Sequence, residues 1–293
     1  MTLEQLRIFI AVAEKQHMTQ AATQLNLTQS ASSAAVAALE SRYDVKLFNR
    51  VGRGITLTHA GRQFLEQARA VVARATVAAQ VLHDLAGLKH GTLSIAASQT
   101  VGNYWLPLRM SKFRTAYPGI TIKLTIANTE QVATQVHNGT ADLGFVEGEV
   151  SDPLIESQEI PGDSMIVVVG KKHPWAKQKK VSPQDLLNSK WVLRERGSGT
   201  RSMFESALRK FGIDPGDLRT ELELPTNESI RSAVAHGDGA TAISDLVVTQ
   251  MLKAHTLTHV KIALPSRPFY ILRHKEHYRS KAEDAFIEKL DVI

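Results

Sequence analysis

The segment "RERGSGTR", residues 194–201, contains the residue types that bind a small oxyanion. Two arginines end an expected strand, a Gly-Ser-Gly turn follows, and a helix begins after it. Glycines let the backbone approach a ligand closely, hydroxyls donate hydrogen bonds, and a helix N-terminus favours negative charge. The candidate ligands are Arg194, Ser198, Gly199, Thr200 and Arg201, and we expect Glu195 to neutralise one of the arginines. A simple loop and helix cap is the alternative.

A second candidate segment, Ser98-Gln99-Thr100, also lies between an expected strand and an expected helix. In open α/β sheets, ligands bind beyond the carboxyl ends of the strands, where helix N-termini point their free N–H groups. Three further polar residues follow strands and could line the same site: Asn128, Glu147 and Asn227. A capping role for Ser98 is the alternative.

Catalytic and metal-binding patterns are absent from the sequence. There is no GxxxxGK[ST] phosphate loop, and Ser198 lacks the G-x-S-x-G surroundings of a nucleophile elbow. The 11 histidines show no metal-ligand spacing, and without cysteine there is neither a disulfide nor thiol chemistry. We therefore expect a binding protein rather than an enzyme, with no metal and no cofactor beyond a small anionic ligand.

The composition is that of an ordinary globular protein with more than one domain. At 293 residues the chain is long enough for two or three units, and 43% of its residues are hydrophobic and 22% charged. No run of about 18 apolar residues could span a bilayer, and the N-terminus lacks the layout of a signal peptide. These features predict a cytoplasmic protein that does not associate with membranes.

The net charge of +6 is concentrated at the N-terminal end. Residues 1–90 contain 10 Lys and Arg against 6 Asp and Glu, while the other 203 residues contain 25 against 23. A basic first third favours a polyanion as partner, with a chance asymmetry of the surface as the alternative.

The first 43 residues show the pattern of a helix-turn-helix. "LEQLRIFIAVAEKQ" has apolar residues at helical spacing, and we expect Thr19 to cap the short helix "QAATQL". After the break "NLTQ", another helix begins at about Gln29. Its expected buried positions are Ala31, Ala35, Val36 and Leu39. A short tight helix, a turn and a second helix make this motif.

A β-hairpin wing follows in "DVKLFNRVGRGITLTHAG". Arg50 and Arg53 flank the glycine-bearing turn, and Ile55-Thr56-Leu57 forms the expected returning strand. Two guanidiniums at such a tip suit phosphates or a minor groove. Solvated surface charges are the alternative.

A long helix capped at Thr58 comes next, and its apolar residues recur at spacings of four and three. They are Phe64, Ala68, Val71, Ala75, Ala78, Leu82 and Leu85. Such a seam predicts a coiled coil between two copies of the chain. A helix packed inside its own domain is the alternative.

From residue 90 onward, expected strands such as "GTLSIAAS", "ITIKLTIAN" and "ADLGFVEG" alternate with helices. The alternation continues through "SMIVVVG", "WVLRERG", "RTELELP" and "ATAIS" to the strand "RPFYILRHK" and a closing helix. This order indicates an α/β domain with a parallel sheet and helices on its faces.

The run "MTQAATQLNLTQSASSAAVAALESRYDVKLFNRVGRGITLTHAG" closely resembles the N-terminal domain of LysR-type transcriptional regulators. The resemblance implies an all-α plus α/β chain: a winged helix-turn-helix over 1–57, a linker helix over 58–88 and an effector domain over 90–293. It also implies that the effector domain is similar to periplasmic binding proteins, with one lobe over about 90–161 and 266–293 and another over about 162–265. The two candidate anion segments would then face each other across the cleft.

In this family the N-terminal turn of the second helix reaches the bases of double-stranded promoter DNA. The candidate DNA-binding residues are therefore Thr19, Gln29, Ser30, Ser32, Ser33, Arg50 and Arg53, with Ala31 or Ala34 against a thymine methyl. Many relatives carry Arg or Lys inside this helix, where the chain has Ala34, Ala35 and Ala37. We expect sparse base contacts, supplemented by repeated half-sites and DNA bending.

The segments "SQTVGNYWLP", "GFVEG" and "RERGSGTR" are most similar to the branch with sulfur-metabolism and carbon-fixation regulators. This resemblance favours a sulfite- or sulfate-like ion or a phosphorylated metabolite, with an organic acid as the alternative, and implies a homodimer or homotetramer that contacts RNA polymerase. Competing hypotheses are an architectural DNA-binding protein without effector, a solute-binding protein of transport, and an α/β-cleft enzyme. The last two lack their expected signal peptide and titratable groups.

Overall fold

The computed structural model describes residues 1–51, 54–85, 90–178 and 181–290. Two compact units make up the chain, one built from Met1–Leu85 and the other from most of the remaining residues. In the described part of the chain, no helix has both the length and the apolar character that crossing a membrane requires.

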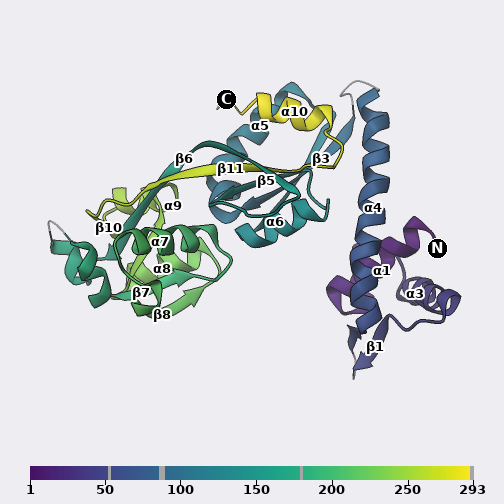
Figure 1. Ribbon diagram of the computed structural model, residues 1–293, viewed down its shortest axis with the longest axis horizontal. Helices are drawn as coiled ribbons and strands as arrows, with labels where there is room; N and C mark the ends of the chain where they lie inside the picture. Colours follow the sequence, from purple (N-terminus) through teal and green to yellow (C-terminus); the bar gives the residue numbers. More distant parts are fainter. Residues whose placement is uncertain (52–53, 86–89, 179–180, 291–293) are drawn as a thin grey trace. The chain divides into compact units, whose positions relative to one another are not determined.

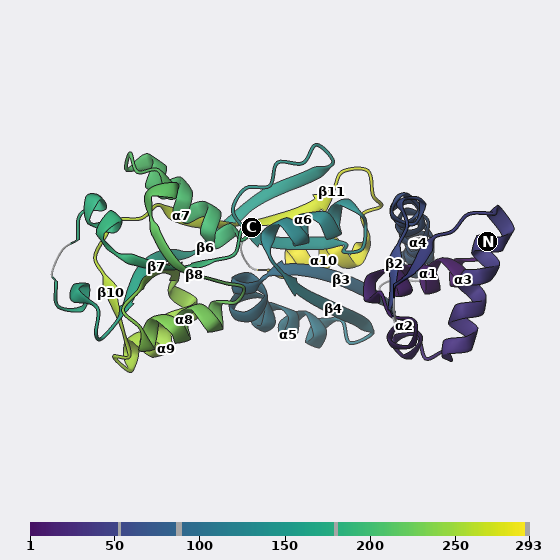
Figure 2. The same cartoon turned by 90° about the horizontal axis from the view of Figure 1, so that it is seen from below.

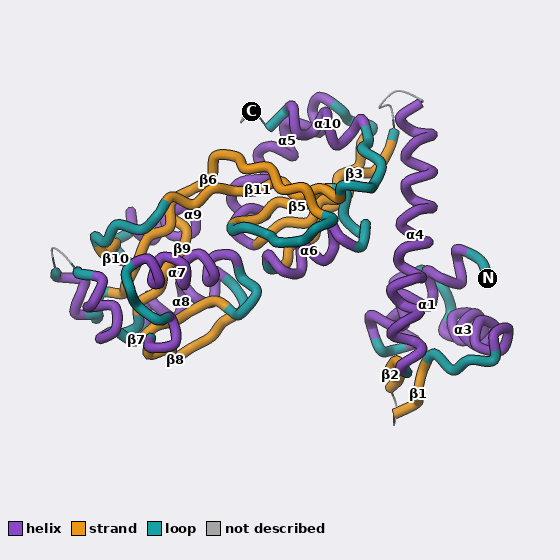
Figure 3. The backbone as a smooth tube through the Cα atoms, in the orientation of Figure 1, coloured by secondary structure: helices purple, strands orange, loops and turns teal. Residues whose placement is uncertain are grey.

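The N-terminal unit is helical, with one small hairpin (Figure 3). Its elements are α1 (Leu3–Lys15), α2 (Met18–Gln24), α3 (Gln29–Tyr43), β1 (Phe48–Val51), β2 (Gly54–Leu57) and α4 (His59–Leu85). The two strands are antiparallel, with Val51 opposite Gly54 and Phe48 opposite Leu57. This order is the helix-turn-helix and wing that the sequence indicates.

Polar side chains fix where these helices begin. The Thr58 hydroxyl accepts a hydrogen bond from the Gly61 N–H at 2.9 Å, which confirms the expected cap of α4. The expected cap of α2 is wrong: His17 takes that position, its Nδ1 accepting from the Gln20 N–H at 3.4 Å. Thr19 already lies within the helix, because the chain becomes helical at Met18.

The core of this unit is small and aromatic. Phe9 is fully buried, and its ring lies 4.9 Å from that of Phe64 on α4. Helix α3 faces the interior with Ser32, Val36 and Leu39, a spacing of four and three. Ala31 is exposed, contrary to expectation, because the buried stripe begins one residue later.

The second unit begins with a three-layered α/β lobe. Its strands are β3 (Gly91–Ser98), β4 (Ile120–Ala127) and β5 (Leu143–Glu147). Its helices are a π-helical turn (Val101–Trp105), α5 (Leu106–Ala116), α6 (Thr129–His137) and α10 (Lys281–Glu288). Strand β3 pairs in parallel with both β4 and β5. Residues of α5 and α10 pack on one face of this sheet, and α6 packs on the other.

The other lobe repeats the arrangement. Its strands are β7 (Lys190–Arg194), β8 (Arg219–Leu224), β9 (Ala240–Ser244) and β10 (Leu257–Val260), and its helices are α7 (Gly199–Lys210), α8 (Asn227–His236) and α9 (Asp245–Lys253). Short 3-10 turns cover Pro174–Lys177, Pro183–Asn188 and Pro215–Asp217. Helix α7 packs on one face of the sheet, with α8 and α9 on the opposite face (Figure 2).

The long strand β6 (Ile155–Gly170) runs through both lobes, and β11 (Ser266–His274) lies beside its first half (Figure 1). Because these two strands are antiparallel, the sheet is mixed rather than wholly parallel, contrary to expectation. Its strand order is β4-β3-β5-β11-β6-β9-β7-β8, with β10 paired to β6. A Cβ atom on Gly162 would lie 1.9 Å from the carbonyl oxygen of Arg267, so only glycine fits there. The close approach joins the two strands where the lobes meet.

Candidate functional site

The centre of the site is a carboxylate held by hydroxyls from both lobes. Strands β3 and β5 end side by side, at Ser98 and Glu147, and α7 of the other lobe begins next to them. The Ser98 hydroxyl donates to Glu147 Oε2, and the Thr200 hydroxyl donates to Glu147 Oε1 at 2.9 Å. All three side chains are buried, with 1% of each residue exposed. Three predicted residues therefore meet at one point.

An arginine-aspartate pair extends this network into the crossing strands. The Arg267 guanidinium donates to the Thr200 hydroxyl at 3.1 Å and to the two carboxylate oxygens of Asp163 at 2.5 and 2.7 Å. The Ser244 hydroxyl also donates to Asp163. Burial raises the pKa of Asp163, whereas Arg267 and Ser244 act in the opposite direction. Sequence reasoning missed these residues, whose only signal was opposite charges on strands 104 positions apart.

A second group of interlobe bonds joins the end of β3 to the start of α8. The Gln99 amide donates to the Pro225 carbonyl at 2.7 Å and accepts from the Asn227 N–H at 3.0 Å. The Asn227 side chain donates to the Thr100 hydroxyl at 3.1 Å and accepts from Arg194 at 2.8 Å. Four more predicted residues, Gln99, Thr100, Arg194 and Asn227, thus lie together.

A third group surrounds the glycine turn before α7. The Gly199 N–H donates to the Thr129 hydroxyl at 3.1 Å, and this hydroxyl donates to the Glu147 carbonyl at 3.2 Å. A Cβ on Gly199 would lie 1.9 Å from that carbonyl, so the turn requires glycine for close approach. Asn128 caps α6, its Oδ1 accepting from the Gln131 N–H at 2.9 Å. The lobes are closed against each other at this contact.

Two arginines of the predicted anion segment, Arg194 and Arg201, are already paired. Glu195 binds Arg194 through two hydrogen bonds of 2.8 and 2.9 Å, as expected. Arg201 bonds Glu205 at 2.8 Å, Glu223, and the carbonyl oxygen of Arg194. Arg201 therefore links α7 to neighbouring residues of its own lobe, and its role as a ligand stays a prediction.

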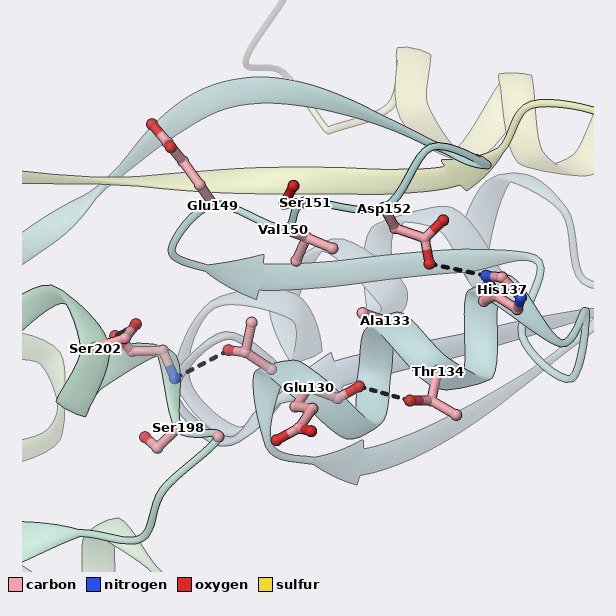
Figure 4. A pocket seen from close by; sticks show the side chains of 13 residues that line it. Glu130, Ala133, Thr134, His137, Glu149, Val150, Ser151, Asp152, Ser198 and Ser202 are labelled. Carbon is pink, nitrogen blue, oxygen red and sulfur yellow. Dashed lines mark hydrogen bonds and ion pairs between the residues drawn. The ribbon is translucent and has the colours of Figure 1, made fainter.

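An open groove of about 530 Å³ lies beside the glycine turn (Figure 4). Its lining includes Glu130, Glu149 and Asp152 but, among the described residues, no lysine or arginine. His137 Nδ1 lies 2.8 Å from Asp152. The buried Ser198 hydroxyl borders the groove without a hydrogen-bond partner. The acidic lining does not suit an anion. The candidate anion site is therefore the buried group of Ser98, Glu147 and Thr200, which we call the interlobe junction.

Helix α3, which the sequence predicts to read DNA bases, exposes only some of the predicted DNA-binding residues. Gln29 and Ser30 are exposed at its first turn, and Ser33 is half-buried. Ser32 is fully buried, with its hydroxyl unpartnered, because it belongs to the inward stripe of α3. A role for Ser32 at base edges is therefore corrected. Thr19 is exposed on α2.

The wing carries the other part of this surface. Arg50 is exposed on β1, and Arg53 lies outside the described residues. Glu40, near the end of α3, accepts hydrogen bonds from the N–H groups of Leu47 and Phe48 at 2.7 and 3.1 Å and pairs with Lys46. Burial acts to raise the pKa of Glu40, but these three donors lower it overall. Sequence reasoning missed this link, although Glu40 is the first charged residue of α3, after eleven neutral ones.

The seam predicted along α4 has two different halves. Phe64 and Ala68 pack into the core of their own unit. Val71, Leu82 and Leu85 are 44%, 69% and 79% exposed. The first half therefore fits the alternative of an internal core helix, and the second half leaves its apolar residues uncovered in the single chain.

Two family models match the chain. Residues 3–62 match the bacterial regulatory helix-turn-helix protein of the lysR family, and residues 86–291 match the LysR substrate binding domain. The chain therefore belongs to the LysR family of DNA-binding transcriptional regulators, with an effector-binding domain.

Known relatives agree with this assignment. The probable RuBisCO transcriptional regulator of Cyanophora paradoxa is 34% identical over 99% of this chain and 91% of that protein. The structure of full-length CbnR with its target DNA has the same fold, with a TM-score of 0.71, 24% identity and 99% of both chains covered. The regulatory domain of CcmR from Synechocystis PCC6803, solved with 2-PG, has a TM-score of 0.62 and 27% identity over 69% of this chain and 96% of that domain. The resemblance to carbon-fixation regulators is confirmed.

Proposed function

We propose that this regulator binds promoter DNA in the cytoplasm as a homodimer or homotetramer and senses a small anion at the junction of its two lobes. One observation carries the sensing part: hydroxyls of Ser98 and Thr200, from opposite lobes, converge on a single carboxylate position. A ligand with a compact oxyanion group fits these donors. CcmR, a similar regulatory domain, was solved with 2-PG, which supports a small ligand at this fold.

Thermal shift of the full chain tests the anion site. We expect at least one of sulfite, sulfate, inorganic phosphate, 2-PG or a small organic acid to raise the melting temperature. Bound ligand stabilises the folded state by RT ln(1 + [L]/Kd), so about 100 Kd of ligand gives roughly 2.7 kcal/mol. Ser98→Ala and Thr200→Val remove the donors and should abolish the shift, while Thr134→Val on α6 should keep it. If no anion shifts the wild type, the chain is better described as an effector-independent DNA-binding protein.

Sensing requires that the anion bind one lobe arrangement better than the other, because a ligand shifts an equilibrium only by its difference in affinity. We propose that the bound anion changes the lobe junction, and with it the spacing of paired DNA-binding units, DNA bending and contact with RNA polymerase. DNase I footprints with and without the effective anion test this step. An unchanged footprint and bend would contradict it.

On the DNA side, we propose that Gln29, Ser30 and Ser33 read base edges, and that Thr19, Arg50 and Arg53 contact the phosphates or the minor groove. The exposure of Gln29, Ser30 and Arg50 supports these roles. Gln can bond adenine with two hydrogen bonds, and arginine suits phosphates. Glu40 supports the surface by tying the base of the wing to α3.

Pairing of subunits is proposed for the second half of α4. Burying a leucine side chain is worth about 1.5–3 kcal/mol, and a symmetric pair buries Leu82 and Leu85 twice. We expect Leu82→Asp to weaken the dimer by more than about 100-fold by the same area argument, measured by analytical ultracentrifugation. The matched change Ala79→Asp, on the same exposed turn but off the seam, should have a much smaller effect.

A further inference from the structure

The position predicted for a bound anion is filled by a side chain of the protein itself. Glu147 lies 99% buried at the end of β5, and its two oxygens accept hydrogen bonds from hydroxyls of opposite lobes. A carboxylate that accepts such bonds has the same charge and donor requirements as a carboxylate or phosphate ligand. In the structure the donor pair is therefore already engaged.

The surrounding charges disfavour the binding of a second anion beside Glu147. The buried cation that touches this group is Arg267, which donates to Thr200 and is already paired with Asp163. Burial raises the pKa of Asp163, and the nearby charge of Glu147 acts in the same direction. Arg194 is neutralised by Glu195. An anion added beside Glu147 would meet two buried carboxylates, and like charges repel strongly at low dielectric.

We propose that Glu147 is an internal anion that closes the interlobe junction when no effector is bound, and that an anionic effector binds by displacing its carboxylate from Ser98 and Thr200. The inference rests on the proposed anion site and specifies how that site is regulated. Binding is then an exchange of one oxyanion for another on the same two hydroxyls. The site selects compact oxyanions, and the wild-type affinity is lowered by the displacement of Glu147.

Calorimetric titration of the full chain with inorganic phosphate, and in parallel with sulfite, tests the exchange. Glu147→Gln keeps the shape of the side chain but removes its charge, and a neutral amide is a weaker acceptor. Charge-assisted hydrogen bonds are roughly twice as strong as neutral ones, so we expect the variant to bind the anion at least about tenfold more tightly.

The matched control is Glu149→Gln, an exposed carboxylate two residues away that touches neither hydroxyl. Because exposed charges are screened, its affinity should stay within about twofold of the wild type. Glu147→Asp keeps the charge but shortens the side chain, so it should bind the anion more tightly than the wild type, with a smaller gain than Glu147→Gln. This variant carries the test if Glu147→Gln does not fold.

The outcomes separate the two proposals. If the wild type binds an anion and Glu147→Gln binds it equally or more weakly, Glu147 is not a competitor and this inference is overturned, while the anion site stands. If neither protein binds either anion, the anion site fails and the inference fails with it. Tighter binding by Glu147→Gln and not by Glu149→Gln supports both.

Discussion

The polar side chains of the recognition surface (Gln29, Ser30 and Arg50 of the N-terminal unit) are exposed, whereas those of the interlobe junction of the second unit are buried. Gln29, Ser30 and Arg50 are exposed, and the core beneath them is apolar and aromatic. At the junction, Glu147, Thr200 and Arg267 are buried and bonded to one another. Polar groups face water in the first region and other polar groups in the second.

Under the function proposed above, this difference implies two modes of binding. DNA binding adds new contacts to the recognition surface, because the exposed side chains lose only bound water when DNA approaches. Contacts to phosphates also release counterions from the DNA. A ligand at the junction must replace bonds that already exist, because buried polar groups are costly to leave unpaired. Under the proposed function, contacts at the junction therefore contribute to both stability and sensing, whereas contacts of the exposed residues of α3 contribute to DNA binding alone.

Arg267→Met should have the largest effect, because it leaves Asp163 buried without its cation. Removing one partner of a buried ion pair costs about 3–5 kcal/mol. We expect a loss of that size in the free energy of unfolding, measured with urea. Arg279→Met is the control: Arg279 pairs with Glu156 at the surface, where both side chains are about half exposed, and such pairs are worth about 0–1 kcal/mol. Equal losses in the two variants would contradict the difference between buried and exposed polar pairs.

Glu283→Gln tests a second buried carboxylate, which, unlike Glu147, does not accept hydrogen bonds from two hydroxyls of opposite lobes. Burial, with a contribution from Asp142, raises the pKa of Glu283 to about 7, although the Ser280 N–H and hydroxyl and Arg273 oppose the rise. The folded state thus holds this proton more tightly than the unfolded state. Stability from this group is present below the ordinary pKa of 4.5 and is lost as the pH rises toward 7, by up to roughly 3 kcal/mol.

The neutral amide introduced by Glu283→Gln should remove that loss, so the variant should be more stable than the wild type at about pH 8 and similar to it at about pH 4.5. Urea unfolding at both values measures the difference, with the exposed Glu288→Gln as control. A wild type whose stability rises between about pH 5 and pH 7 by the same amount as that of Glu283→Gln would refute this assignment.

Gln29→Ala should separate binding from stability. An exposed substitution of this kind changes the free energy of unfolding by less than about 0.5 kcal/mol, whereas loss of a base contact reduces discrimination by about 1–3 kcal/mol. Competition binding with the promoter fragment and variants of it measures the discrimination. Gln67→Ala, exposed on α4, is the control. A clear loss of stability with unchanged base preference would reverse the role proposed for this residue.

Arg50→Ala should have the smallest effect on recognition. A phosphate contact contributes equally to all sequences, so the variant should bind every duplex more weakly and lower the slope of log K against log salt by about one. Binding isotherms at several salt concentrations give this slope, and Lys123→Ala on the edge strand β4 should leave it unchanged. A change in base preference without a change in slope would place Arg50 at a base edge.

Local signals in the sequence predicted most elements. The glycine-bearing turn after Arg50 predicts the wing, and Thr58 predicts the start of α4, because turns and caps depend on neighbouring residues. Helix α9 and strand β10 were not predicted, although Ser244 caps α9 through the Leu246 N–H. Ser32 was misplaced because a helix of alanine and serine gives no contrast between its inner and outer faces.

At the site, the sequence indicated Ser98, Thr200 and Glu147 because each follows a strand or begins a helix. It did not indicate that Glu147 fills the position where a ligand was expected, or that Arg267 lies beside Thr200. These facts depend on residues 53 and 67 positions apart in the chain meeting across two lobes. Patterns among residues that are close in the sequence do not predict such long-range contacts.

The sequence alone determined most of the order of elements, the start of α4 and the kinds of polar residue available at the ends of the predicted strands, because these follow from local backbone preferences and hydrophobic spacing. Only the tertiary structure decided which hydroxyls, carboxylates and guanidiniums face one another. The reason is physical: a buried polar group takes its partner from whatever the packing of the two lobes brings within hydrogen-bond distance. At the junction, packing brought Glu147 to Ser98 and Thr200.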